Sequence, residues 1–155
     1  MYKIGDEALE IRRIENHDFD YVKKLVTDVF MEFEAPDYSD EGIATFFETA
    51  INNQDYMNSL AIYAAYENKK MVGVIATRNN GNHIALFFVD GTYHRQGIGR
   101  NLFETVLKNT TADEITVNSS PYAKDVYHHL GFEDTDVEQI VTGIQFIPML
   151  YRKRS

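Results

Sequence analysis

The residues with the most recognisable chemistry form a short loop between an apolar run and a helical pattern. The apolar run covers Ile84 to Val89, and apolar residues at helical spacing begin at Ile98. Gly97 and Gly99 lie where the loop becomes the helix, and there the backbone N–H groups lack an acceptor within the helix and carry partial positive charge. Because glycine has no Cβ, an anion can approach these N–H groups closely. The loop is therefore a candidate phosphate-binding cradle.

Two glycines at this spacing also occur in plain strand-to-helix turns, so the spacing alone favours phosphate binding and a simple tight turn equally. The dinucleotide-binding fingerprint is not fulfilled, since Leu102 stands where it requires glycine or alanine. A Walker loop is excluded because no Lys-Ser or Lys-Thr pair follows the glycines. A dinucleotide-binding protein is therefore a disfavoured alternative.

The loop resembles the acyl-CoA motif of the GCN5-related N-acetyltransferases (the GNAT family), in which Gln/Arg-x-x-Gly-x-Gly/Ala follows an apolar strand and opens a helix. The residues that carry the resemblance are His94, Arg95, Gln96, Gly97, Ile98, Gly99 and Arg100. The segment departs from the family pattern in His94, which replaces Gln or Arg, and in Gly91, where many members have proline. The resemblance implies that backbone N–H groups from about Arg95 to Arg100 hold the pyrophosphate of CoA, with the Arg95 and Arg100 side chains placed to help.

A second segment, residues 118–132, resembles the family's Ala-x-x-Phe/Val-Tyr-x-x-x-Gly-Phe motif. Its apolar residues repeat at helical spacing and place Tyr127 on the apolar face of a predicted helix that stops at Gly131. Ser119 or Ser120 is a candidate N-cap for this helix. The resemblance implies that Tyr127 is the general acid for the departing CoA thiolate, whereas its residue type alone also fits a core tyrosine with a satisfied hydroxyl.

The resemblance also implies where the pantetheine arm of CoA binds. In the family, the strands equivalent to Ile84–Val89 and Glu114–Asn118 splay apart, and pantetheine bonds to the exposed backbone between them. The implied contacts are Phe87, Phe88, Val89 and Asn118, and the N–H of Val89 is the implied oxyanion donor. Asn118 is equally well explained as a turn residue at the end of a strand.

The base that deprotonates the acceptor amine is not identified by the sequence. Glu32 and Glu34 lie in the region implied to bind the acceptor, and His83 lies at the start of a strand. Each of these residues is otherwise a solvated surface group, and a chain of water molecules is an equal candidate for the base. The neighbouring aromatic residues either line an acceptor pocket or belong to the core; they are Phe30, Phe33, Tyr38, Phe46 and Phe47.

Composition restricts the classes of partner. The 155 residues carry a net charge of −9 and include no cysteine, which excludes disulfides and Cys-ligated zinc. The acidity argues against nucleic-acid binding; it either steers a cationic amine toward the protein or only provides solubility. Adjacent His128 and His129 point about 100° apart on a helix, so no metal site is expected. We expect neither a membrane span nor a signal peptide, and the absence of cysteine fits a cytoplasmic protein.

Hydrophobic periodicity predicts one domain over residues 1–155, with an α/β fold in the order β-α-α-β-β-β-α-β-α-β-β. The predicted strands cover residues 9–14, 60–67, 71–78, 84–89, 114–118, 137–141 and 144–151. The predicted helices cover residues 18–33 and 39–51 and begin again at residue 98 and after residue 120, with 34–38 as a loop and 52–58 as a polar connection. Helical crossovers require some parallel pairing, so a mixed sheet with helices on both faces follows, and this order matches the GNAT family.

The two motifs together imply an acetyl-CoA-dependent N-acetyltransferase without a metal cofactor. The expected reaction is direct transfer to a primary amine of a small molecule, a peptide or a protein. The alternative is a noncatalytic acyl-CoA-binding module with the same fold, which the presence of Tyr127 disfavours. The sequence leaves open the acceptor, the use of other acyl groups, and whether the chain is a monomer or a homodimer.

Overall fold

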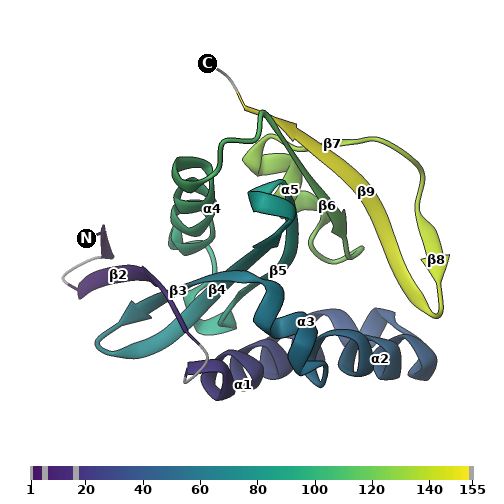
Figure 1. Cartoon of the computed structure of the whole chain (residues 1–155). Helices are drawn as coiled ribbons and strands as arrows, with labels where there is room; N and C mark the ends of the chain where they lie inside the picture. Colours follow the sequence, from purple (N-terminus) through teal and green to yellow (C-terminus); the bar gives the residue numbers. More distant parts are fainter. Residues whose placement is uncertain (1, 5–6, 16–17, 154–155) are drawn as a thin grey trace.

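The computed structural model describes residues 2–4, 7–15 and 18–153. Its strands follow the order β1-β2-β3-β4-β5-β6-β9-β7 across the sheet, and β8 pairs with the free length of β9 (Figure 1). β5 and β6 run parallel, and the other pairs of described strands are antiparallel. The strands are β1 Tyr2–Ile4, β2 Glu7–Arg13, β3 Ala61–Glu67, β4 Lys70–Arg78, β5 His83–Val89, β6 Glu114–Ser119, β7 Glu133–Asp134, β8 Gln139–Val141 and β9 Ile144–Arg152.

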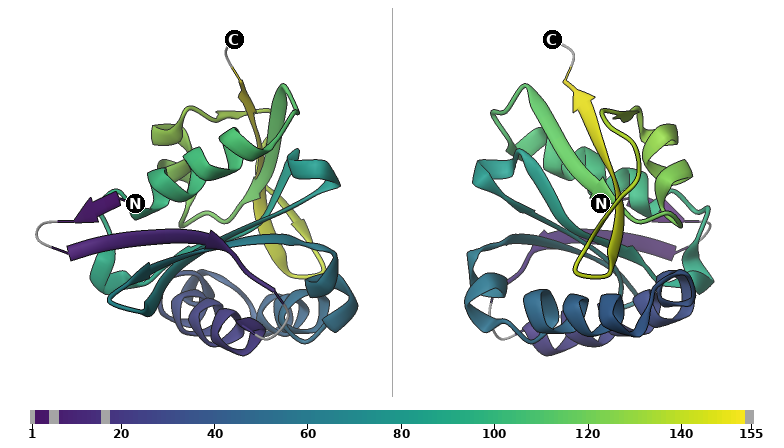
Figure 2. Two further views of the ribbon diagram at one scale, coloured as in Figure 1. Left: turned by 60° about the vertical axis from the view of Figure 1, so that its left-hand side comes forward. Right: turned by 90° about the vertical axis from the view of Figure 1, so that its right-hand side faces the viewer.

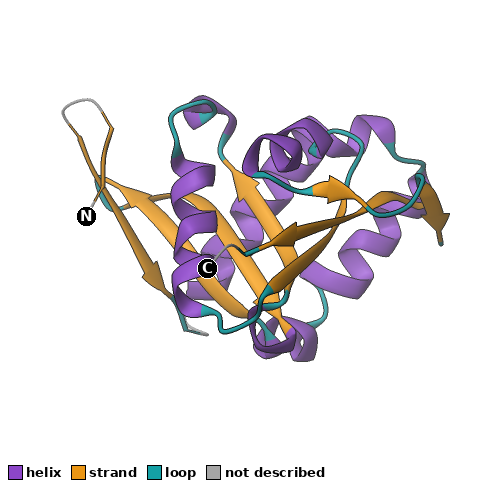
Figure 3. Ribbon diagram, turned by 90° about the horizontal axis from the view of Figure 1, so that it is seen from above, coloured by secondary structure: helices purple, strands orange, loops and turns teal. Residues whose placement is uncertain are grey.

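Helices cover both faces of the sheet, as Figures 2 and 3 show from three directions. They are α1 Phe19–Val29, α2 Asp40–Phe46, α3 Gln54–Ser59, α4 Ile98–Asn109 and α5 Lys124–Leu130. On one face, α1 buries Val22 and Val26 against the central strands. On the other face, α4 and α5 bury Leu102 and Tyr127 against the same sheet. The predicted mixed sheet with helices on both faces is confirmed.

Three short elements were not predicted: β1, α3 and β7. The segment predicted as a polar connection contains α3, whose first turn is capped by Asn53 through a 3.0 Å bond from the Tyr56 N–H. This helix is anchored by the buried Met57. A helix of this length with a single buried residue has no hydrophobic periodicity from which it could be predicted.

The segment predicted as a loop after the first helix is helical, so that prediction was wrong. The helix α1 continues as a π-helical turn, Phe30–Glu34, and then as a 3₁₀ turn, Ala35–Asp37. A second π-helical turn, Phe47–Ile51, extends α2. A π-helical turn holds one more residue than an α-helical turn, and such turns are frequent at functional sites. The aromatic residues of this region pack mostly as core. Phe30, for example, stacks on Phe46, with the ring centroids 4.1 Å apart.

The β8–β9 hairpin reaches across the molecule to the helices that follow β2. The Thr45 hydroxyl donates to the carbonyl of Thr142 at 2.8 Å, and the Tyr38 hydroxyl donates to the carbonyl of Gln145 at 3.2 Å. The hairpin, predicted around Thr142, is thereby held against α2. Within residues 2–4, 7–15 and 18–153, no helix has both the length and the apolar character that a membrane crossing requires.

Candidate active site

The parallel strands β5 and β6 separate soon after they meet. Their register pairs His83 with Thr116 and Ile84 with Val117, and no later residues of β5 pair with β6 in the part of the chain that the structure describes. β6 instead pairs with β9 along its whole length. The second half of β5 therefore has one edge that is hydrogen-bonded to β4 and one edge without a strand partner among the described residues, and this break in pairing between β5 and β6 is an opening in the sheet.

A β-bulge in β5 coincides with this separation. Thr77 of β4 pairs with Ile84 of β5, and the preceding residue of β4, Ala76, pairs with Leu86. Ala85 of β5 therefore has no partner in β4. A bulge bends a strand and increases its twist, and it is found next to active sites. The bend directs the end of β5 away from β6, which creates the splayed pair that the resemblance implied.

The hydrogen-bonding pattern of β5 shows which backbone groups face the opening. The Asp90 N–H donates to the Val72 carbonyl at 2.8 Å, which makes Gly73–Val89 a non-hydrogen-bonded pair of the antiparallel ladder. The N–H and carbonyl of Val89 therefore point away from β4. By the same alternation the backbone of Phe87 also faces the opening, whereas the backbone of Phe88 is bonded to β4. Of the three implied pantetheine contacts on β5, Phe87 and Val89 can offer backbone groups.

The loop after β5 is held by its own side chains. The Asp90 carboxylate accepts from the Thr92 N–H at 2.9 Å, and the ring Nε2–H of His94 donates to the Val89 carbonyl at 2.7 Å. His94 therefore fixes the end of the strand, a role that its place in the motif did not indicate. The side-chain amide of Gln96 reaches only the Thr92 carbonyl, at 3.4 Å.

The start of α4 has the geometry of an anion cradle. Arg95 and Gly97 both have left-handed backbone angles, with φ of 64° and 83°, and a left-handed arginine costs roughly 1–2 kcal/mol. A Cβ built on Gly97 would have no atom within 4 Å, so the space above this residue is open. The helical bonds begin with the Asn101 N–H and the Gly97 carbonyl. The N–H groups of Ile98, Gly99 and Arg100 are therefore without acceptors among the described residues and are available to a phosphate.

The side chain of Arg100 is engaged with the second motif. Its Nη2 donates to the carbonyl of His129 at 3.1 Å, at the C-terminal end of α5. This bond ties the start of α4 to the helix that carries Tyr127. Part of the positive charge of Arg100 is therefore directed at the end of a helix, where the helix dipole favours a cation.

Tyr127 is buried beside the opening in β5. Its ring contacts Phe87 edge-on, with centroids 5.8 Å apart, and Phe132 at 5.3 Å. Burial, followed by the charge of Glu34, raises the pKa of the Tyr127 hydroxyl, so this group stays protonated at neutral pH. Among the hydrogen bonds of the described residues, none involves this hydroxyl.

Glu34 lies close to the same opening, on the π-helical turn Phe30–Glu34. Its carboxylate lies close to Ser120, a buried residue just beyond the end of β6. Burial raises the pKa of Glu34 to about 7, although Ser120 acts in the opposite direction. The charge of Glu34 in turn raises the pKa of Tyr38, Tyr122 and Tyr127. The carboxylate and three tyrosines therefore form one cluster.

Phe33 joins the two loops that border the opening. Its ring lies 4.8 Å from His94 in the loop after β5 and 5.3 Å from Tyr122 in the loop after β6, measured between centroids. Phe33 also packs, partly buried, against the same core as Tyr38, Phe46 and Phe47. Glu32 is exposed and lies beside the same loop, since its Oε1 would be 3.2 Å from a Cβ on Gly91. The π-helical turn is therefore packed directly on the candidate cradle.

Other sequence candidates lie elsewhere. His83 is at the opposite end of β5 from Val89, about 20 Å away along an extended strand, and burial lowers its pKa to about 4. Asn118 is exposed within β6 and is paired in register with Pro148, so it is not a turn residue. Its place before Ser119 at the splayed end of the strand keeps it a candidate contact for pantetheine.

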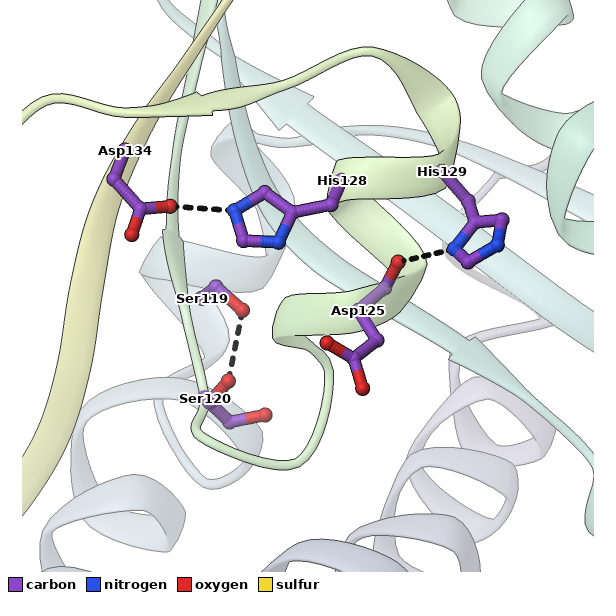
Figure 4. A network of polar contacts seen from close by, with 6 residues as sticks. All are labelled: Ser119, Ser120, Asp125, His128, His129 and Asp134. Atoms are coloured by element: carbon purple, nitrogen blue, oxygen red, sulfur yellow. Dashed lines mark hydrogen bonds and ion pairs between the residues drawn. The ribbon is translucent and has the colours of Figure 1, made fainter.

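The histidines of α5 make local contacts (Figure 4). The Nε2–H of His128 lies 2.6 Å from a carboxylate oxygen of Asp134, and the Nδ1–H of His129 donates to the carbonyl of Asp125 at 2.9 Å. Ser120 accepts from the Ala123 N–H at 3.2 Å and so caps the turn before α5. Within the described part of the chain, no three His, Cys, Asp or Glu side chains come together as metal ligands would.

Sequence reasoning missed four contributors to this site. Ser120 was considered only as a helix cap, and it also lies close to the carboxylate of Glu34. Phe33 and Tyr38 were placed in a general aromatic set, and Tyr122 was not singled out. Their contacts join segments far apart in the sequence, so no local pattern could have found them.

Comparison with known proteins accounts for this arrangement. The profile of the acetyltransferase (GNAT) domain matches residues 34–153. A GCN5-related N-acetyltransferase from Rhodopseudomonas palustris has a TM-score of 0.78 and 15% identity, over 98% of this chain and 99% of its own. An N-acetyltransferase, PaiA, from Thermoplasma acidophilum, solved in complex with coenzyme A, has a TM-score of 0.75 and 17% identity, over 94% and 99%.

A solution structure of apo YjaB from Escherichia coli is also similar, with a TM-score of 0.72 and 20% identity over 95% of this chain and 99% of its own. At these identities the solved structures show a shared fold. No curated protein matches the chain in sequence. The family profile, in contrast, covers most of the chain, including the cradle and the tyrosine helix. The protein therefore belongs to the GNAT acetyltransferase family.

Proposed function

We propose that the protein transfers the acetyl group of acetyl-CoA directly to a primary amine. The observation that carries this proposal is the splayed pair of β5 and β6, with the Val89 N–H facing the opening and the anion cradle directly after it. The cradle fits a pyrophosphate, and the exposed edge of β5 fits an extended amide-containing arm such as pantetheine. The coenzyme A complex of the Thermoplasma acidophilum relative is consistent with this assignment.

The residues around the opening supply what acetyl transfer requires. The amine nitrogen attacks the thioester carbonyl, and the N–H of Val89 would stabilise the negative charge that develops on its oxygen. The hydroxyl of Tyr127 would donate a proton to the departing thiolate, since its raised pKa keeps it protonated. The roles of Phe87, Asn118 and the N–H groups from Arg95 to Arg100 are to bind and orient acetyl-CoA.

The test is release of the CoA thiol from acetyl-CoA in the presence of a panel of primary amines, with detection of the acetylated amine by mass spectrometry. We expect the release of thiol to depend on the amine. The affinity for acetyl-CoA, in contrast, should be the same with and without the amine. Acetyl-CoA binding without transfer to any amine of the panel would instead favour the noncatalytic binding module. Absence of acetyl-CoA binding would contradict both functions.

We also propose that Glu32 and Glu34 attract a cationic acceptor. Burial raises the pKa of Tyr122 most, and the charges of Glu34 and, to a smaller extent, Glu32 raise it further. Because both carboxylates affect the same tyrosine, Glu32 and Glu34 lie on the same side of the opening. Conversion of both to Gln is expected to raise the KM for amines severalfold and to leave the Kd of acetyl-CoA unchanged. The measurement is KM at low and high ionic strength, because steering between exposed charges is screened by salt. An acceptor KM that neither rises in the double variant nor depends on salt would show that the steering idea is wrong.

A further inference from the structure

We propose that the protein has a second binding site, for a small organic anion, at the end of α4 that is remote from the candidate cradle. A cavity of about 580 Å³ lies there, between the C-terminal end of α4 and the ends of β2 and β4. Its volume is within the range of pockets that hold small molecules. Arg13 and Arg78 line the cavity and hold the phosphate or carboxylate group of the ligand.

The register of the sheet places Arg13 on the face that α4 covers. Arg13 of β2 is opposite Tyr63 of β3, and Tyr63 packs against the same core as Val106 of α4. Side chains that are opposite each other on neighbouring strands project from the same face of a sheet. Arg12, the preceding residue, projects from the other face, where its guanidinium group stacks on Tyr66.

The charge of the cavity differs from that of the chain. Arg13 and Arg78 carry the charges among the described residues that line it, although the net charge of the chain is −9. Across the described parts of the chain, neither arginine forms an ion pair or a hydrogen bond, whereas Arg12 pairs with Glu10 at 3.3 Å. Two unpaired guanidinium groups in one cavity attract an anion, and their planar donors match the geometry of a carboxylate or a phosphate.

Two hydroxyl groups add uncharged donors to the same cavity. Thr77 is 3% exposed, and the half-buried Tyr63 lies diagonally across from it, because Ala61 is the direct partner of Thr77. Neither hydroxyl is hydrogen-bonded to a described residue. Both residues line the cavity, so a ligand oxygen there has access to these donors.

The C-terminal end of α4 restricts the kind of anion that fits. The carbonyl groups of its last turn carry partial negative charge, which amounts to about half a unit and weakens the attraction of the two full arginine charges without cancelling it. The same carbonyls accept hydrogen bonds, and Asn58, Asn80 and Asn109 add side-chain amides to the lining. The cavity therefore favours an anion with hydroxyl groups, such as a sugar phosphate or a hydroxy acid.

One wall of the cavity is fixed by the protein itself. The turn Asn79–Gly81 has left-handed backbone angles at all three residues, and asparagine tolerates this conformation better than most residues do. The hydroxyl of Thr110 donates to the Asn80 carbonyl at 3.2 Å and accepts from the Ala112 N–H at 3.1 Å. The turn is thereby tied to the residues that follow α4, so ligand binding requires little reorganisation of this wall.

This site is separate from the acetyl-CoA site. The candidate cradle lies at the start of α4 and the cavity at its end, and the 12 residues of this helix span about 18 Å. Neither Arg13 nor Arg78 has a part in the proposed acetyl transfer. The inference therefore goes beyond the proposed function and does not depend on it.

The test is a titration of the ¹⁵N-labelled protein with two probe anions, ribose 5-phosphate and L-malate, followed by NMR. The amide signals of residues 77–81, 110 and 111 report on the cavity, and those of residues 97–100 report on the cradle, which can also bind a phosphate. We expect saturable shifts of the cavity signals with at least one probe and none with chloride at the same ionic strength. The probe with the lower Kd shows whether the site prefers a phosphate or a carboxylate.

Variants connect these shifts to the named side chains. R13Q and R78Q are each expected to raise the Kd at the cavity about tenfold, because each removes a charge-assisted donor. T77V should raise it severalfold without lowering the melting temperature, since valine has nearly the shape of threonine. The matched control is R12Q, which removes the same charge from the other face of β2 and should leave the Kd unchanged.

Three outcomes would overturn the inference. They are shifts confined to the cradle signals with both probes, cavity shifts that chloride reproduces, and an equal loss of affinity in R12Q and R13Q, which would indicate a general effect of net charge. Melting curves check that the variants are folded. Failure of the unaltered chain to bind acetyl-CoA would contradict the proposed function and leave the anion site intact.

Discussion

Replacement of Tyr127 by Phe is expected to lower kcat by about 10²–10⁴-fold, because the thiolate then leaves without its proton donor. The variant keeps the ring and therefore its edge-on contacts with Phe87 and Phe132. The free energy of unfolding should change by less than about 1 kcal/mol, since the hydroxyl is not bonded to any of the described residues. Affinity for acetyl-CoA should fall little, because the cradle and the edge of β5 are untouched.

The measurement is kcat with a working amine, together with the Kd of acetyl-CoA and the melting temperature. Chemistry must be shown to limit the rate, for example by the absence of a burst of thiol release. A folded Tyr127→Phe protein with near-normal kcat would make Tyr127 a core residue and leave water as the proton source.

The second large effect is expected at the cradle. Gly97→Val should weaken acetyl-CoA binding about 10²-fold or more, since the side chain would occupy the open space through which a phosphate reaches the N–H groups. Losing two charge-assisted hydrogen bonds of roughly 1.5–3 kcal/mol each accounts for a loss of that size. Gly99→Val should also weaken binding, but by crowding Phe87 and Val89, because a Cβ on Gly99 would lie 3.5 Å from the Phe87 ring and 3.9 Å from Val89.

Calorimetry with acetyl-CoA decides this prediction, and melting curves check that both variants are folded. Gly97→Asn is the control for strain, because asparagine tolerates the left-handed conformation better than valine does. His94→Ala removes a side chain but no N–H of the cradle, so it should weaken binding less than either valine. Unchanged affinity in both folded valine variants would rule out the cradle.

The features that the sequence predicted well are local ones. The start of α4 after an apolar strand follows from hydrophobic spacing and from Gly97, and the position of Tyr127 on the buried face of α5 follows from the same spacing. Each depends on residues within one or two turns of each other. The family resemblance added the splayed strands, which spacing alone does not indicate.

The features that the sequence did not predict depend on contacts between distant segments. The bulge at Ala85 has no marker such as glycine, and it is recognised only from the register with β4. The π-helical turn that carries Glu34 was predicted to end before that residue, because Pro36 and Asp37 favour a loop. The burial that raises the pKa of Glu34 depends on tertiary packing, and Ser120, which acts on the same carboxylate, is remote in sequence, so the raised pKa could not be inferred from the neighbours of Glu34.

The contact between the β8–β9 hairpin and the α2 region has a consequence for the order in which the molecule assembles. The Thr45–Thr142 and Tyr38–Gln145 bonds join residues that are 97 and 107 positions apart in the chain. Closing loops of that length carries an entropic cost that is recovered only once the intervening sheet has formed. During synthesis, the helices at residues 30–51 must also wait for almost the whole chain to emerge before this contact can form. We therefore expect this side of the molecule to be the last to become protected from hydrogen exchange during refolding.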